Sequence, residues 1–378
     1  MSDPIGLYIH VPFCVSKCPY CDFYSLQGQS PEVMDAYTNA VIDALALWYQ
    51  KLGGVSADTL YIGGGTPTLL GGKRLKRILD KATKLFKLKN AEITMEANPG
   101  DLLDEVFSAF ASAGGNRVSI GMQTCDDAQL RFLRRRHRPQ DVENAVAAAH
   151  ACGINNISLD IMLGLRGQSV KSVVFDISRA FEIGASHVSA YILKIEEGTL
   201  FYQNRDTLFL PDSDECAELY LAACQTADML GYRQYEISNF AMPGYECRHN
   251  IKYWNLDPYL GIGPAAHSYI NNTRFYYEQD INLFLKGVMP VHEQDKPQKG
   301  NHNIHEHENE YIMLRLRLDE GIKYNEFKAK FGRDIPQSVI DRAKELPSHL
   351  ISVDNDGIRL TRLGFLLSNT LICKLLYD

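Results

Sequence analysis

Three closely spaced cysteines are the residues of this chain that best suit metal chemistry. Cys14, Cys18 and Cys21 follow a short apolar run in the pattern Cys-x3-Cys-x2-Cys. Thiolates on one such loop can converge on an iron–sulfur cluster. With no fourth cysteine nearby, a four-iron cluster keeps one iron open for a small molecule, as catalytic metal sites do. The loop therefore predicts an open [4Fe-4S] site; the alternative is structural zinc with a distant fourth ligand such as His10 or Cys247.

Composition excludes several classes of protein. The chain has 378 residues, of which 45% are hydrophobic and 22% charged, which is typical of a globular protein with a large core and an appended domain. A net charge of -7 argues against a general nucleic-acid binder. There is no pattern of a signal peptide and no long apolar run. We therefore expect a cytoplasmic protein whose nine cysteines stay reduced.

The residues up to about 195 alternate short β-rich runs with amphipathic helical patterns, and six strands are expected. Such alternation predicts parallel strands joined by right-handed crossovers. We expect an α/β fold built as a partial (β/α)6 barrel, with a flat doubly wound sheet as the alternative. The expected strands are residues 6–13, 59–63, 92–97, 117–122, 157–163 and 187–193, and the expected helices are residues 31–51, 73–86, 101–113, 140–152 and 170–183.

Glycine and polar residues gather where these strands end. The run Gly-Gly-Gly-Thr-Pro at residues 63–67 follows the second strand, Glu96 lies at the end of the third, and Gln123 follows the fourth. Asp160 lies within the fifth. Because ligands of parallel α/β folds bind at the carboxyl ends of strands, these residues and the cysteine loop should face one pocket.

The alternation stops after residue 195. A long helix is expected over residues 212–230 and a strand over residues 232–240, followed by the motif HNIKYW at residues 249–254 and a glycine-rich stretch ending at His267. A polar linker is expected near residues 294–303. The last part predicts helices over residues 306–318, 323–331 and 336–345, a hairpin over residues 350–360 and a closing helix over residues 361–376, which together indicate a small winged-helix-like domain.

The cysteine loop and the glycine run together resemble the radical S-adenosylmethionine superfamily. In that superfamily the open iron is chelated by the amino and carboxylate groups of S-adenosylmethionine. An electron from the cluster then cleaves a carbon–sulfur bond to give a 5′-deoxyadenosyl radical, while the protein supplies orientation and shielding. The resemblance implies a [4Fe-4S] cluster on the three cysteines and S-adenosylmethionine as a second cofactor.

Nearly the whole chain is similar to the branch that contains the anaerobic coproporphyrinogen III oxidases and their relatives. This resemblance implies three parts: a radical S-adenosylmethionine core at residues 1–235, an extension carrying HNIKYW at residues 236–300, and a helical domain at residues 301–378. The positions that it implies for S-adenosylmethionine contact are Tyr8, Tyr20, Gly64, Gly65, Thr66, Glu96, Gln123, Arg135 and Asp160.

Two departures separate this chain from the oxidases. They carry a further cysteine two residues after the third, where this chain has Phe23, and they have a longer N-terminal extension. The motif His-Asn-x-x-Tyr-Trp marks their sister group, the heme-chaperone family HemW, which this chain resembles more closely. That resemblance implies heme binding through His249, transfer to acceptor hemoproteins of respiration, and at most peripheral contact with a membrane. A homodimer is allowed.

The motif residues have side chains that suit heme. Imidazole is a common axial ligand of heme iron, so His249 could bind the metal. Tyr253 and Trp254 offer flat apolar faces with polar tips. Cys247 is a candidate second ligand. The alternative is a structural histidine beside two core aromatic residues.

Other functions stay open at this point. The enzyme alternative is oxidative decarboxylation of coproporphyrinogen III, and a further alternative is another radical enzyme acting on porphyrins. Whether S-adenosylmethionine is cleaved in function is also open. His302, His305 and His307 could bind a divalent metal, but their position before a helix favours a solvated capping region.

Overall fold

The computed structural model describes residues 3–101, 103–292 and 306–377. Its centre is a run of six parallel strands that are neighbours in chain order. The predicted α/β fold is therefore confirmed, and each expected strand is present within two residues of its predicted bounds. The strands are β1 (Ile5–Val11), β2 (Ala57–Gly64), β3 (Glu92–Ala97), β4 (Arg117–Gln123), β5 (Asn156–Leu163) and β6 (His187–Ile192).

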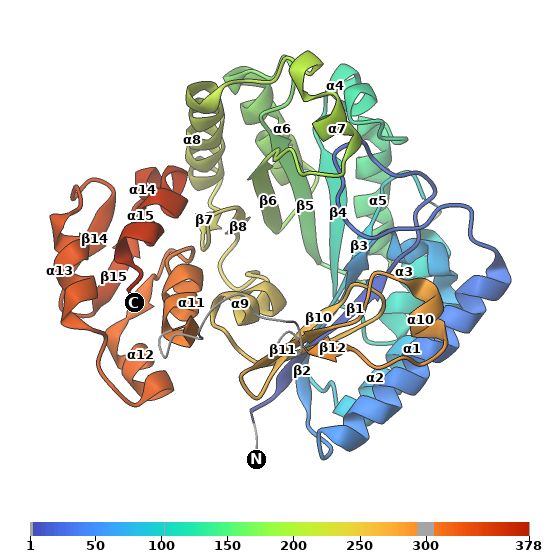
Figure 1. Cartoon of the computed structure of the whole chain (residues 1–378). Coiled ribbons are helices and arrows are strands. Elements are labelled where there is room, and N and C mark those ends of the chain that lie inside the picture. Colours follow the sequence, from blue (N-terminus) through green and yellow to red (C-terminus); the bar gives the residue numbers. More distant parts are fainter. Residues whose placement is uncertain (1–2, 102, 293–305, 378) are drawn as a thin grey trace.

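Helices cover the outer face of this sheet (Figure 1). Pro31 stands at the first position of the first long helix, where its fixed φ suits helix initiation and its missing N–H is not needed. The predicted helices are all present, within three residues of their expected bounds. They are α1 (Pro31–Lys51), α2 (Gly71–Phe86), α3 (Asp104–Ser112), α5 (Pro139–Ala151) and α6 (Val170–Glu182), with short α4 (Asp127–Phe132) and the 3-10 turn η1 (Pro67–Leu70) between them.

The central strands alternate between an apolar outer face and a polar inner face. In β4, Val118 and Ile120 are buried in the hydrophobic core, whereas Arg117 and Ser119 line a cavity on the inner side. One cavity wall collects side chains from five strands, β2 to β6, so the sheet curves into an open barrel rather than lying flat. The residues of β2 to β6 on that wall are Tyr61, Glu96, Arg117, Ser119, Asp160, Met162, Ser189, Tyr191 and Ile192.

Later parts of the chain extend both edges of the sheet. β9 (Tyr259–Ile262) pairs in parallel with β1, and antiparallel β10 (His267–Ile270), β11 (Thr273–Tyr276) and β12 (Val291–His292) follow it. At the other edge lie β8 (Asn239–Ala241) and β7 (Arg233–Gln234). The single strand predicted over residues 232–240 is wrong, because the chain reverses there and Gln234 pairs with Phe240. The remaining elements of this part are α7 (Leu200–Gln203), η2 (Arg205–Thr207), α8 (Ser213–Met229) and α10 (Ile281–Leu285).

The HNIKYW motif forms a short helix, α9 (Arg248–Trp254), which sequence patterns did not predict. Its first amides are bound by a buried carboxylate at the start of β3, since Glu92 accepts hydrogen bonds from the backbone N–H groups of Arg248 and His249 at 3.0 Å each. The first N–H groups of a helix have no partner within the helix, so this acid fixes where α9 begins. Because Glu92 opens β3, the motif lies at the amino ends of the strands, opposite the cysteine loop.

The C-terminal part is a small separate module with its own three-stranded sheet. The predicted helices and hairpin are present, but the closing helix is split at Leu367. Its elements are α11 (Glu306–Arg315), β13 (Ile322–Lys323), α12 (Tyr324–Phe331), α13 (Gln337–Glu345), β14 (Ile351–Val353), β15 (Gly357–Leu360), α14 (Arg362–Leu366) and α15 (Ser368–Leu375).

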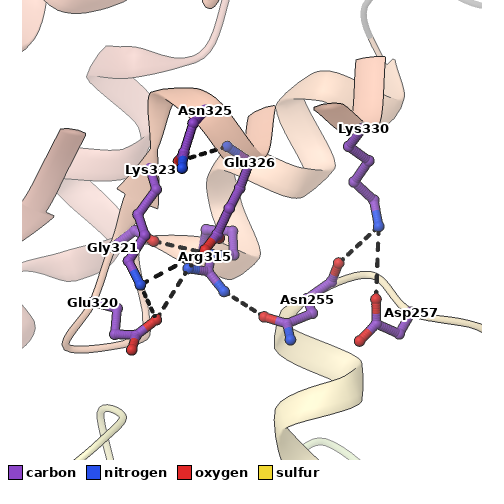
Figure 2. Close-up of polar contacts among 9 residues, drawn as sticks. All are labelled: Asn255, Asp257, Arg315, Glu320, Gly321, Lys323, Asn325, Glu326 and Lys330. Carbon is purple, nitrogen blue, oxygen red and sulfur yellow. Dashed lines mark hydrogen bonds and ion pairs between the residues drawn. The ribbon is translucent and has the colours of Figure 1, made fainter. Parts of the chain in front are cut away.

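This module is tied to the end of α9 by two cations (Figure 2). Lys330 donates to the carbonyls of Asn255 and Leu256 at 3.0 Å each. Arg315 is 3% exposed, donates to the Gly321 carbonyl at 2.9 Å and also bonds the Asn255 side chain. The last carbonyls of a helix need such donors, so the module satisfies the end of the motif helix.

No helix in residues 3–101, 103–292 or 306–377 is long and apolar enough to cross a membrane.

Candidate cluster and cofactor site

The cysteine loop is held at the carboxyl end of β1 by backbone contacts. Cys14 N–H donates to the Leu26 carbonyl at 2.9 Å, and Leu26 N–H donates to the Pro12 carbonyl at 2.7 Å, which closes the loop. The three thiols are free and partly exposed. Cys14, Cys18 and Cys21 line one cavity of about 170 Å³. The structure thus brings together the three residues predicted to hold the cluster.

The thiols are not gathered as they would be around one ion. In the described ranges no group of three His, Cys, Asp or Glu side chains is close enough to hold a single metal ion. Two donors do approach the sulfur atoms: the Thr66 hydroxyl lies 3.6 Å from Cys14 Sγ, and Arg135 Nη1 lies 3.9 Å from Cys18 Sγ. Three separate thiols with nearby donors fit the ligand set of an iron–sulfur cluster.

The glycine run after β2 allows the backbone to pass close to this loop. A Cβ on Gly65 would lie 2.5 Å from the Phe13 carbonyl oxygen, so no larger residue fits without a shift. Gly64 has φ +107°, a conformation that L side chains rarely adopt. Gly65 N–H donates to the Val11 carbonyl at 2.8 Å, and Thr66 N–H donates to the Phe13 carbonyl at 2.6 Å. All three predicted residues of this run line the same cavity as the thiols.

Arg135 is aimed into the cavity by the way α4 ends. Arg134 takes a left-handed conformation (φ 52°), and Arg135 N–H donates to the Leu130 carbonyl at 2.9 Å. The Arg135 guanidinium then donates to Asn98 Oδ1 at 2.7 Å and to the Gly121 carbonyl at 2.8 Å. Its neighbours Arg134 and Arg136 are exposed instead. The predicted arginine is therefore the one that reaches the cavity.

Two partly buried carboxyl groups, Glu96 and Asp160, line the same cavity. Glu96 accepts hydrogen bonds from the Tyr61 hydroxyl at 2.9 Å and from Gly64 N–H at 3.0 Å. Burial and the charge of Asp160 raise the pKa of Glu96 to about 7. Burial also raises the pKa of Asp160 to about 6, although Ser119 donates to it at 3.1 Å. A cationic ligand would favour both charged forms, so the arrangement suits a ligand with positive groups.

Of the other three predicted cofactor contacts, two line the cavity and one does not. Gln123 (φ 67°) and Tyr20 line the cavity, and the Gln123 side chain accepts from the Tyr191 hydroxyl at 2.9 Å. Tyr8 does not line this cavity; its hydroxyl lies 3.0 Å from His10 Nδ1 and its ring lies 6.3 Å from that of Tyr61.

His249 lies in the protein interior, 1% exposed, on the far side of Tyr61 from the cavity. Its Nδ1 lies 2.9 Å from the Thr59 hydroxyl and its Nε2 lies 2.8 Å from the Tyr253 hydroxyl. Burial, with the nearby charges of Lys252 and Arg117, lowers the pKa of His249 to about 3, so the ring is neutral. Because both ring nitrogens are in hydrogen bonds, iron ligation by His249 would require one of these bonds to break.

The remaining candidate ligands are scattered. Cys247 is fully buried, with its sulfur 3.6 Å from Glu92 Oε1. His267 is exposed and its ring stacks on Tyr276. His307 is exposed and lies 3.9 Å from Glu310, whereas His302 and His305 and the predicted linker lie outside the described residues. Nothing in the described part brings these side chains to the cysteine loop.

A second cavity, of about 410 Å³, adjoins the first and reaches toward α9. Sequence reasoning missed most of its wall, including Tyr61, Arg117, Tyr191 and Asn250. The signal that could have found Tyr61 and Arg117, and with them the wall residue Ser119, is the period of two in the strands. Tyr61 precedes Gly63 by two residues, and Ser119 and Arg117 precede Gly121 and Gln123 on one face.

Comparisons with known proteins agree with this geometry. The family model of the radical SAM superfamily matches residues 8–178, and that of the HemN C-terminal domain matches residues 305–367. The chain is 36% identical to the heme chaperone HemW of Bacillus subtilis over 371 residues, covering 96% of each chain. It is 35% identical to the heme chaperone HemW of Escherichia coli over 384 residues, covering 98% of this chain and 97% of the relative.

A solved structure shows the same fold. Coproporphyrinogen III oxidase (HemN) from Escherichia coli, a radical SAM enzyme, matches with a TM-score of 0.82 over 98% of this chain and 90% of that chain. Its sequence identity is only 20%, so this likeness concerns the fold. The near full-length identity to the curated relatives goes further, and the chain belongs to the HemW family within the radical S-adenosylmethionine superfamily.

Proposed function

We propose that this protein binds heme and passes it to acceptor hemoproteins. The observation that carries the proposal is the identity of more than 30% to heme chaperones over nearly the whole chain. Transfer needs only a difference in heme affinity between donor and acceptor, so no catalytic base is required. A cytoplasmic location, respiratory acceptors, peripheral membrane contact and a homodimer stay predictions.

The cluster part of the proposal rests on the cysteine loop. Cys14, Cys18 and Cys21 would hold a [4Fe-4S] cluster, whose open iron supplies electron transfer to a chelated S-adenosylmethionine when both are bound. Glu96 and Asp160 would favour the positive groups of that ligand, and Arg135 would fix the loop against the wall of the cavity. The glycine run would let backbone groups approach it closely.

The heme part of the proposal keeps His249 as the iron contact. In the structure its Nε2 is held by the Tyr253 hydroxyl, so heme would have to displace that hydroxyl and approach from the side of α9. Tyr253 and Trp254 are on the same short helix and could then contact the macrocycle.

A transfer assay tests this function. The reconstituted full-length protein is loaded with heme under anaerobic conditions and mixed with an apo-hemoprotein that can be separated from it by size. We expect the Soret absorbance to move from the donor fraction to the acceptor fraction. Retention of heme on the donor in the presence of excess acceptor would refute the proposal.

Decarboxylation of coproporphyrinogen III is a second candidate, favoured by the shared fold and by a cavity of about 410 Å³ beside the cofactor site. The same preparation is incubated with S-adenosylmethionine, a reductant and coproporphyrinogen III. Catalytic formation of protoporphyrinogen IX would support the oxidase, whereas its absence together with heme transfer would support the chaperone.

A further inference from the structure

Arg117 is a buried cation with unused hydrogen-bond donors. Its side chain is 2% exposed, lies at the start of β4 and lines the cavity of about 410 Å³. In the described ranges its guanidinium makes no ion pair within 4.0 Å and no hydrogen bond, and its Nε is shielded from solvent. By contrast, the other buried arginine of similar exposure, Arg315, has a carbonyl at 2.9 Å and a carboxylate at 3.0 Å. A buried charge without partners is costly, so Arg117 needs a separate explanation.

Arg117 is charged although no neighbour in the described ranges uses its donors, because a guanidinium keeps its proton in proteins. Burial lowers the pKa of Arg117, but nearby Cys247 and Glu92 outweigh this effect and hold the pKa above its usual value. The Glu92 oxygens are already engaged with the amides of Arg248 and His249. Five N–H groups in a planar fork, facing a cavity, match the two oxygens of a carboxylate.

The other side chains of the cavity wall indicate which kind of ligand would fit there. The wall carries neutral polar side chains, including Ser189, Asn239 and Asn250, and it also carries the carboxyl groups of Glu96, Asp160 and Glu196. At the other end, beyond the carboxyl ends of the strands, Phe23 (57% exposed) and Ile192 (39% exposed) form an apolar rim. A molecule with a carboxylate at one end and an apolar body at the other fits this distribution.

We propose that Arg117 is the anchor of a carboxylate subsite at the floor of this cavity, and that the carboxylate is a propionate of the bound heme. The second part rests on the proposed function, because it takes heme as the ligand. Asn250, which lies next to His249 in the motif, reaches this cavity and connects the subsite to α9. The shared chemistry is a carboxylate; a separate small carboxylic acid is the other source.

The test compares heme with its dimethyl ester, whose propionates are blocked. Both are titrated by Soret absorbance into the reconstituted full-length protein, into Arg117→Met, and into the control Arg359→Met, which removes an exposed guanidinium of the C-terminal hairpin. We expect wild type and Arg359→Met to bind the ester at least tenfold more weakly than heme. Arg117→Met should bind heme as weakly as wild type binds the ester, and its affinity for the ester should be unchanged.

The wild-type comparison of heme with ester does not depend on any variant folding, and Arg117→Gln serves as a second variant if Arg117→Met is unstable. A parallel experiment measures the shift in melting temperature caused by sodium propionate at about 10 mM. The high concentration is used because a small carboxylate that binds weakly stabilises the protein only when it is in large excess. An Arg117-dependent shift with equal binding of heme and ester supports the subsite and overturns its assignment to heme.

Equal binding of heme and ester, with no Arg117-dependent response to propionate, overturns the whole inference. If wild type binds neither heme nor ester, the proposed function fails, and the propionate arm alone then supports or overturns the subsite. The two failures are therefore distinguishable.

Discussion

The Tyr61 hydroxyl donates a 2.9 Å hydrogen bond to Glu96, and the ring of the same tyrosine contacts His249 of the motif. The rings of Tyr61 and His249 are stacked with centroids 5.3 Å apart. One side chain of β2 thus joins the predicted cofactor pocket to the helix that carries HNIKYW. A change in the position of Glu96 or of His249 therefore alters a contact of Tyr61.

Tyr61→Phe should weaken binding of S-adenosylmethionine about tenfold. A hydrogen bond to a charged group contributes about 1.5–3 kcal/mol, and its loss raises the pKa of Glu96 further above its usual value. The affinity is measured by equilibrium dialysis on the reconstituted protein. Tyr269→Phe is the matched control, because the Tyr269 hydroxyl donates to the Asn272 side chain at 3.0 Å and lies outside the pocket. An unchanged affinity in Tyr61→Phe would show that the Tyr61 bond does not support the ligand.

Tyr253→Phe and His249→Ala should have opposite effects on heme. If His249 Nε2 binds iron, removing the Tyr253 hydroxyl leaves one hydrogen bond fewer to break, and heme affinity should rise about fivefold. His249→Ala should remove the spectral signature of imidazole ligation while the cluster absorbance stays. Unaltered heme spectra in both variants, together with lower melting temperatures, would instead assign His249 a structural role in the barrel floor.

Arg315→Ala should destabilise the junction between α9 and the C-terminal module (Figure 2). The side chain is buried and holds Asn255, Gly321 and Glu326, so its removal leaves buried polar groups unpaired and should cost about 3 kcal/mol. The free energy of unfolding in urea measures this. Lys328→Ala breaks an exposed pair with Asp334 and should cost less than about 1 kcal/mol. Equal losses in the two variants would contradict the role given to Arg315.

Asp176→Asn should flatten the pH dependence of stability. Burial raises the pKa of Asp176 to about 6 from 3.8, and Oδ2 has no hydrogen-bond partner in the described part of the chain. Because the pKa of Asp176 is higher in the folded protein than in the unfolded chain, the unfolded chain loses this proton at a lower pH. The free energy of unfolding therefore falls as the pH rises from about 4 to about 6, and is level above that. The difference amounts to about 3 kcal/mol. Urea unfolding at pH 4, 5, 6 and 7 should show this fall in wild type and less of it in the variant; parallel curves would refute the assignment.

Much of the barrel could be predicted because its signals are local. Pro31 and the apolar spacing after it define α1, and the β-rich run that starts at Glu92 defines β3, so both were predicted within their observed bounds. The pocket was predicted because parallel strands end at one edge, which places Glu96 and Asp160 together without any knowledge of contacts.

The features that the sequence did not predict share a cause: each depends on contacts with residues far away in the chain. The reversal after Gln234 has no glycine or proline to mark it, and only pairing with Phe240 reveals two strands. His249 could not be seen as buried from the motif alone, because its partners Thr59 and Glu92 come from strands far earlier in the chain. Arg117 was missed because a single arginine in a strand gives no sign of lying unpaired beside a cavity.

The place of α9 in the chain also sets an order of assembly. Glu92 and His249, which meet at the floor of the barrel, are 157 positions apart. Chain segments leave the ribosome from the N-terminus, so the cysteine loop and all six parallel strands are synthesised before the helix that closes their amino ends. Lys330 and Arg315, which hold the end of that helix, come later still. A nascent chain therefore has its three loop cysteines long before α9, and under the proposed function iron–sulfur loading can precede any encounter with heme.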